Sequence, residues 1–174
     1  VLLYQFVTLI KKGEKVKMST RKANFITLDS LVDEVGLDVV RYFFVMRSMN
    51  THLDFDLDLA ADQSDKNPVF YLQYAYARIS NIIKRGKESN ISFNENFKPH
   101  ILSDIDEINL LKYLIRFPEY INLSYANFEP QNIANYLQGL ATKFHKFYGN
   151  CRVLSDDIDK SKSRMALIKA VKIV

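Results

Sequence analysis

The stretch NPVFYLQYAYARISNIIKR, from Asn67 to Arg85, indicates most plainly what kind of fold this chain adopts. Asparagine is a good helix cap and proline fits the first helical turn, so Asn67–Pro68 predicts the start of a helix. Apolar residues then recur at helical spacing, which predicts one buried face. We expect the helix to end at Gly86. The predicted buried face consists of Leu72, Ala75, Tyr76, Ile79, Ile82 and Ile83.

Helical patterns continue toward the C-terminus. Residues 87–102 are polar and contain Pro99, which predicts a long loop. Ser103 is expected to cap the next helix, and Pro118 and Pro130 can each open another. The predicted helices are residues 104–117, a helix opened by Pro118, Gln131–Tyr148 and Lys160–Val174; the stripe of the third is Ile133, Tyr136, Leu137, Leu140, Phe144 and Phe147 or Tyr148.

The N-terminal third has a different pattern. Residues 1–10 are rich in β-branched and aromatic side chains and precede Gly13, which predicts a buried strand and a turn. Residues 25–28 form a second short β-like run. Thr27 is expected to cap a helix over Leu28–Val35 that ends at Gly36.

Two further features complete this third of the chain. Asp38 is expected to start a largely buried helix and to pair with Arg41 one turn later. Residues 52–60 alternate apolar and acidic side chains before turning helical. The chain as a whole is therefore predicted to be all-α, an antiparallel helical bundle preceded by a short strand and loop segment.

Composition narrows the class of protein. The 174 residues are 48% apolar and 25% charged, as in a soluble globular protein, and no apolar run is long enough to cross a bilayer. The only cysteine, Cys151, excludes an internal disulfide and suits a reducing compartment. We expect a cytoplasmic protein without membrane contact. The first ten residues lack an initiator Met and the features of a signal peptide, so we expect a piece of a longer chain.

Charge is distributed unevenly along the chain. Six of the twelve residues from Lys11 to Lys22 are basic, and so are eight residues between Lys143 and Lys172, whereas residues 54–65 contain five aspartates. A polyanion would meet two separated positive regions. From charge alone, ordinary solvated surfaces explain the same pattern, so both interpretations stay open.

The basic segment contains Lys17-Met18-Ser19-Thr20-Arg21, which resembles the KMSKS loop of class I aminoacyl-tRNA synthetases. The surrounding sequence resembles one family within that class, the arginyl-tRNA synthetases, in the family's order and spacing. The resemblance spans the chain apart from the loop at 87–102. It is carried by VLLYQFVTLIKKGEKVKMSTRKANFITL, GLDVVRYFFVMRSMNTHLDFDLDLA, NPVFYLQYAYARISNI and LATKFHKFYGNCRVL.

The resemblance implies a function. The family activates arginine with ATP and transfers it to its tRNA, and the KMSKS loop stabilises charge on the leaving pyrophosphate. It implies ATP binding by Lys17, Met18 and Ser19 and catalytic roles for Lys17 and Arg21. Thr20 stands where the motif has its second lysine, so we expect Arg21, Lys22 or another lysine elsewhere in the complete enzyme to compensate. Ala23 stands where the family commonly has glycine, which implies altered loop mobility.

The resemblance also implies a division of the chain. Residues 1–28 would be the end of the catalytic domain, 29–66 a helical linker that contacts the tRNA stem, and 67–174 a DALR-type anticodon-binding bundle whose last helix continues. The family's HIGH motif would precede residue 1. We therefore expect the segment alone neither to aminoacylate nor to bind a cofactor. The implied partners are tRNA-Arg and, for the full-length enzyme, ATP with Mg²⁺ and arginine, in a monomer.

Two sets of side chains are candidates for binding RNA. Tyr74, Arg78, Asn81 and Arg85 share one face of the helix after Pro68, and aromatic rings and guanidiniums stack on unpaired bases. Near residue 150, Tyr148 and Arg152 follow a helix that we expect Gly149 to break. Lys143 and Lys146 on that helix would contact phosphates.

Other interpretations remain. The histidines and Cys151 lack the spacing of metal ligands, so no metal site is predicted. A helical domain of a related class I synthetase, such as the cysteine enzyme, fits the same helices. A non-catalytic helical module that binds other proteins is the alternative from a different class.

Overall fold

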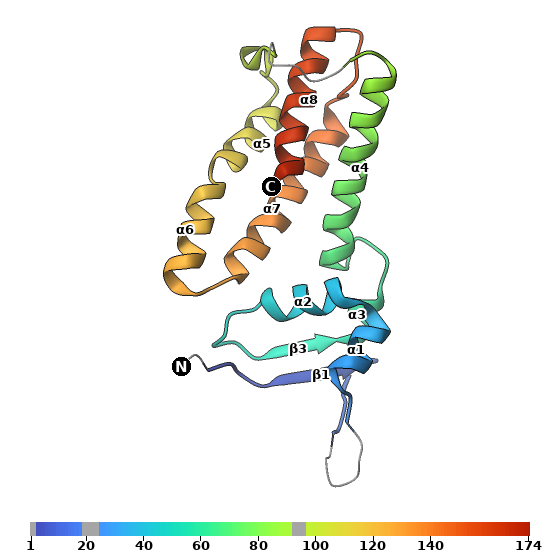
Figure 1. The fold of residues 1–174 in the computed structure, drawn as a ribbon, viewed down its shortest axis with the longest axis vertical. Helices are drawn as coiled ribbons and strands as arrows, with labels where there is room; N and C mark the ends of the chain where they lie inside the picture. Colours follow the sequence, from blue (N-terminus) through green and yellow to red (C-terminus); the bar gives the residue numbers. More distant parts are fainter. Residues whose placement is uncertain (1–2, 19–24, 92–96) are drawn as a thin grey trace. The chain divides into compact units, whose positions relative to one another are not determined.

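The computed structural model describes residues 3–18, 25–91 and 97–174. The chain forms two compact units, taken here in turn: Val1–Tyr71 with Leu123–Asn135, and Leu72–Asn122 with Tyr136–Val174. Figure 1 shows the elements of both units. No helix in the described ranges combines the length and the apolar character that crossing a bilayer requires.

The first unit is built on a small sheet in the order β2-β1-β3. Strand β1 (Val7–Lys11) pairs antiparallel with β2 (Glu14–Lys15) and parallel with β3 (Leu53–Asp56). The β1–β2 turn is Lys12-Gly13, with φ of 53° and 75°. Positive φ at both central residues is what a tight hairpin requires, and it agrees with the predicted turn at Gly13.

Three short helices cover this sheet: α1 (Leu28–Val35), α2 (Leu37–Val45) and α3 (Leu57–Ala61). The Oγ1 of Thr27 accepts a hydrogen bond from the Ser30 amide at 3.1 Å, and Gly36 ends α1 with a φ of 89°. Both ends of α1 were predicted from these residues and are confirmed.

Several predictions in this region are wrong. The strand expected over residues 1–10 is limited to Val7–Lys11, and residues 3–6 are exposed. Residues 25–27 form no strand, because Thr27 is already the helix cap. Helix α2 begins at Leu37, with Gly36 in the capping position, rather than at Asp38. Asp38 and Arg41 form no ion pair within the described ranges, and both are exposed. Only Val40 and Phe43 of α2 are buried, so this helix is not largely buried as expected.

The core of the first unit lies between the sheet and its helices. Phe43 of α2 and Phe55 of β3 pack with ring centroids 5.1 Å apart. Leu53 and Phe55 are buried while Asp54 is exposed, as the alternating pattern predicted. Residues of 1–28 and of 29–66 share this one core; the boundary at residue 28 stays a prediction. The buried members are Leu9, Leu31, Val40, Phe43, Phe55, Leu57, Ala60 and Val69.

The second unit consists of helices, which confirms the all-α prediction for most of the chain. Figure 1 shows α4, α7 and α8 alongside one another, and side chains of all three line a common apolar depression. The elements are α4 (Pro68–Glu88), η2 (Pro99–Ile101, a 3-10 turn), α5 (Ile105–Ile115), α6 (Phe117–Asn127), α7 (Gln131–Asn150) and α8 (Ile158–Ile173); α4, α6 and α7 begin or end in the first unit.

Helix α4 begins as predicted but does not end at Gly86. Asn67 caps it by accepting from the Val69 amide at 2.9 Å. At the other end, the Ile91 amide donates to the Gly86 carbonyl at 2.8 Å and the Asn90 amide to that of Lys87 at 3.1 Å. With Asn90 at a φ of 56°, this is a Schellman ending in which asparagine takes the left-handed position.

Gly86 serves close packing instead. A Cβ there would lie 2.8 Å from the Ile91 carbonyl oxygen and 2.7 Å from the Met165 Cε. Gly139 in α7 is similar, because its Cβ would lie 2.0 Å from the Tyr113 hydroxyl. These glycines let other elements approach their helices.

The core of the second unit centres on aromatic residues of α7. Tyr136, Phe144 and Phe147 are fully buried. The Tyr136 ring lies 4.9 Å from that of Tyr113 and 4.8 Å from that of Tyr120, and its hydroxyl donates to the Tyr113 carbonyl at 3.1 Å. Burial raises the pKa of Tyr136 to about 12. The predicted α7 stripe therefore packs as expected.

Other local predictions fail. Tyr76, assigned to the buried stripe of α4, is 56% exposed. Helix α5 is capped by Asp104 rather than Ser103, since Asp104 and Glu107 form a reciprocal capping box. Gly149 does not break α7, which continues through Asn150.

Candidate nucleic-acid interface

One face of α4 carries the side chains proposed to contact RNA. Tyr74, Arg78, Asn81 and Arg85 line a surface depression of about 190 Å³, together with Tyr148 of α7. The spacing along α4 predicted that the first four share a face. The structure adds that the Tyr148 ring closes the same depression.

Arg78 lies at the centre of this cluster. Its guanidinium carbon is 4.4 Å from the Tyr74 ring centroid and 4.5 Å from that of Tyr148. One of its nitrogens also donates to the Tyr74 hydroxyl. Both rings are partly exposed, at 46% and 37%. Two cation–π contacts therefore hold a planar cation and two rings in place at the surface.

His145 of α7 packs against the cluster, a role that was not predicted from the sequence. The His145 and Tyr74 rings are stacked, with centroids 5.7 Å apart and planes 19° apart. The His145 Nδ1 lies 3.5 Å from an Arg78 nitrogen. Since His145 lies 67 residues from Arg78 along the chain, only packing of α4 on α7 could show it.

A larger depression, of about 620 Å³, adjoins the first and shares Arg85 and Tyr148 with it. The exposed side chain of Arg152 lines it, as does the backbone turn after α7. Burial raises the pKa of the Cys151 thiol in this turn to about 11, so it is a packing residue at neutral pH. Because they are predicted to bind RNA, we call the following side chains the RNA surface: Tyr74, Arg78, Asn81, Arg85, Tyr148 and Arg152.

The two proposed phosphate ligands of α7 do not line these depressions. The Lys146 Nζ lies 3.3 Å from the Asp106 carboxylate, so its charge is partly neutralised within the protein. Lys143 is exposed on the same helix, and its charge also acts on Asp106. Phosphate binding by Lys143 and Lys146 stays a prediction, weaker for Lys146 because of this ion pair.

The first turn of α5 braces the end of α7. The Asn150 side-chain amide donates to the Asp106 carboxylate at 2.6 Å. This hydrogen bond, followed by the nearby Lys146, holds the pKa of Asp106 below its ordinary value. The ionised form of Asp106 is therefore the one that the folded protein stabilises.

We expect this carboxylate to make stability depend on acid pH. Because its folded pKa is depressed, its contribution is present above the ordinary value of about 4 and is lost as pH falls through the folded pKa. Urea unfolding midpoints of the wild type and Asp106→Asn should converge between pH 6 and pH 3. Asp159, whose pKa the Lys98 ammonium lowers, affects both proteins alike. Midpoints that differ equally at both pH values would contradict this role.

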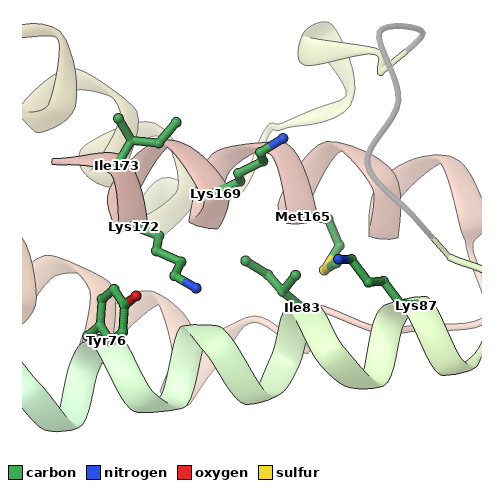
Figure 2. Close-up of a pocket in the computed structure, with 7 residues that line it drawn as sticks. All are labelled: Tyr76, Ile83, Lys87, Met165, Lys169, Lys172 and Ile173. Carbon is green, nitrogen blue, oxygen red and sulfur yellow. The ribbon is translucent and has the colours of Figure 1, made fainter.

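A groove of about 360 Å³ on α4 and α8 lies apart from the RNA surface and shares no residue with it. Figure 2 shows Ile83 of α4 and Met165 of α8 pointing toward each other, and Lys172 extending toward Tyr76. The Lys172 Nζ lies 4.7 Å from the Tyr76 ring centroid. Tyr76 thus lines an open groove instead of the core. The groove is also lined by Lys87, Lys169 and Ile173.

The N-terminal motif is only partly described by the structure. Lys17 and Met18 follow β2 and are exposed, Met18 at 45%. Ser19 and Arg21, with Thr20, lie outside the described residues. Among the residues that are described, no group of three or more His, Cys, Asp or Glu could hold a metal ion.

Comparison with known proteins agrees with this arrangement. The DALR anticodon binding domain model matches residues 72–174. Arginine–tRNA ligases of Salinibacter ruber and Carboxydothermus hydrogenoformans are 48% and 47% identical to the chain over all of its length, and the chain covers 31% and 32% of them. A Campylobacter jejuni crystal structure described as an arginyl-tRNA synthetase superposes with a TM-score of 0.78 at 31% identity, covering 98% of this chain and 37% of that one.

The chain thus spans about a third of the length of the curated relatives that it matches. The domain model covers residues from the second turn of α4 to the end of α8, which include every residue of the RNA surface. The chain is similar over its whole length to arginine–tRNA ligases, and through residues 72–174 it belongs to the DALR anticodon binding domain family.

Proposed function

We propose that this chain is the anticodon-binding part of an arginine–tRNA ligase and that its RNA surface binds the anticodon loop of tRNA-Arg. The observation that supports this most directly is the Arg78 guanidinium held between the Tyr74 and Tyr148 rings beside two open depressions. Such a surface suits an RNA loop, whose unpaired bases can leave the stack.

The chemistry of the six side chains divides into two tasks. Exposed rings and guanidinium planes stack on bases regardless of identity, and Tyr74, Arg78 and Tyr148 are suited to it. The Asn81 amide carries both a donor and an acceptor, which can match one base edge. Arg85 and Arg152 lie along the larger depression, where they suit phosphates or base edges.

We expect Arg78→Ala to lower the affinity for an arginine-accepting tRNA by about 1–3 kcal/mol, or roughly 5- to 150-fold. The variant loses one cation and leaves both rings without the group that orients them. Filter binding or fluorescence anisotropy against salt concentration measures the effect. The salt dependence should also become shallower, because fewer counterions are released.

Lys84→Ala is the matched control, since it removes one positive charge from the same helix but lines neither depression. Equal losses for Arg78→Ala and Lys84→Ala would show that charge alone is sensed and that this surface is not the site. No tRNA binding by the wild type at low salt would favour a helical module that binds proteins. Preference for a tRNA of another amino acid would favour a related synthetase.

We further propose that the N-terminal segment contributes to arginine activation in the complete enzyme. Lys17 would face the ATP phosphates, Met18 and Ser19 would contact the nucleotide, and Arg21 would supply the second cation that Thr20 lacks. ATP with Mg²⁺ and arginine are then substrates of the complete enzyme, which we expect to be monomeric and cytoplasmic. The support is the resemblance of the motif, with relatives matching across residues 1–28.

A further inference from the structure

We propose that Arg164 is a positioning residue that holds the backbone of Arg152 and thereby shapes the larger depression of the RNA surface. The proposal rests on the proposed function, because it assigns Arg164 a role in RNA binding without contact to RNA. Arg164 belongs to α8, is 7% exposed and lines neither depression.

One guanidinium makes both contacts that matter. The Arg164 Nε donates to the Glu107 carboxylate at 2.5 Å, and its Nη1 donates to the Arg152 carbonyl at 2.7 Å. Because both donors belong to one rigid plane, the position of the Arg152 carbonyl depends on the position of the Glu107 carboxylate. A shift of Arg152 relative to α5 would therefore break a charge-assisted hydrogen bond.

The carboxylate is itself fixed. Glu107 is fully buried, and its second oxygen accepts from the Ser103 and Asp104 amides, each at 2.9 Å. One Glu107 oxygen thus accepts from the backbone at the start of α5, and the other accepts from the Arg164 guanidinium. Because the helix cap and the ion pair use one side chain, Glu107 gives Arg164 a rigid support.

The same turn is held on its other side. Asn150 donates to Asp106, the neighbour of Glu107 in α5. Cys151, between these two anchors, is 2% exposed, and Val153, directly after them, is 4% exposed. The backbone of 150–153 is therefore tied to α5 and α8, while Arg152 itself is exposed and lines the open depression. This combination presents a cation to a ligand in a prearranged place, which lowers the entropy cost of binding.

Arg164→Lys tests the proposal in the whole chain. A lysine keeps the positive charge beside Glu107, but a single ammonium cannot also provide the fork that reaches the Arg152 carbonyl. We expect affinity for the anticodon stem-loop of an arginine-accepting tRNA to fall about tenfold, as for one lost hydrogen bond to a charged group. Amide exchange at residues 151–154 should become faster while that of α4 stays unchanged.

A double-mutant cycle separates positioning from general destabilisation. If Arg164 acts by placing Arg152, Arg164→Lys should cost little further affinity in an Arg152→Ala background. Ser163→Ala is the control, because this buried neighbour bonds the Lys98 carbonyl, away from the RNA surface. It should leave stem-loop affinity unchanged. If Arg164→Lys does not fold, Glu107→Asp replaces it in the same cycle. The shorter aspartate side chain moves the carboxylate away from Arg164.

Each outcome decides the proposal. Additive losses from Arg152→Ala and Arg164→Lys, or unchanged affinity for Arg164→Lys, would overturn the positioning role of Arg164. The proposed function would still stand if Arg78→Ala weakens binding. Absence of stem-loop binding by the wild type would overturn both.

Discussion

Glu107→Gln is expected to lower the free energy of unfolding by about 3–5 kcal/mol, the usual cost of leaving one member of a buried ion pair alone. Glu107 is fully buried and Arg164 is 7% exposed. The Arg164 Nε lies 2.5 Å from the Glu107 carboxylate, so this pair joins α5 and α8 through residues 57 positions apart in the chain. A loss of this size is a large part of the 5–15 kcal/mol that stabilises a typical domain.

The reason lies in what a glutamine can offer. Glu107 accepts from Arg164 with one oxygen and from two backbone amides with the other. Glutamine has a single acceptor oxygen, and its NH₂ group would face either the guanidinium or the two amides. One set of buried donors therefore loses its acceptor.

Urea or thermal unfolding followed by circular dichroism measures the change. Glu119→Gln is the control, since the exposed Arg116–Glu119 pair should contribute nothing measurable. Replacing both buried partners, as in Glu107→Met with Arg164→Met, should recover part of the loss because no charge is left alone. If Glu107→Gln is no more harmful than Glu119→Gln, the pair does not stabilise the fold.

Lys17→Ala is expected to slow arginine activation by about 10²- to 10³-fold, the effect of removing one group that stabilises developing charge in a transition state. The test is arginine-dependent ATP–pyrophosphate exchange in a chimera that joins this chain to the N-terminal two thirds of the Salinibacter ruber ligase. That relative is 48% identical over the chain, which favours correct joining.

The expected loss depends on how charge is shared within the motif. Thr20 cannot supply the second cation of the resembling loop, so we expect Lys17 and Arg21 to carry more of the proposed phosphate contact. Lys15→Ala, in the exposed strand β2, is the control and should leave exchange near the wild-type rate. An unchanged exchange rate in Lys17→Ala, in an active chimera, would remove the proposed role of this loop.

The local course of the chain follows from short patterns. Asn67 with Pro68 marked the start of α4, and Thr27 with Gly36 marked both ends of α1. These signals work because a cap satisfies backbone groups within three or four residues of itself. The shared face of Tyr74, Arg78, Asn81 and Arg85 follows equally from the helical repeat.

Several of the failed predictions concern where a helix begins or ends. Gly86 and Gly149 were interpreted as helix ends, yet both lie inside helices. Gly86 is there because Met165 and the Ile91 carbonyl approach it. Ser103 was expected to cap α5, but the Asp104 carboxylate accepts from the Asp106 amide and takes that place. A glycine in a sequence shows that the backbone is less restricted there, but it does not show whether a helix end or a close contact requires the glycine.

The sequence by itself determined the helices, several of their ends and the α4 half of the RNA surface, since all of these depend on neighbours within a few turns. Only the tertiary structure decided that Tyr148 completes the contact around Arg78 and that Arg164 meets both Glu107 and the Arg152 carbonyl. Those contacts join residues on different helices. Their existence depends on how buried side chains interlock across the bundle, which helical spacing does not encode.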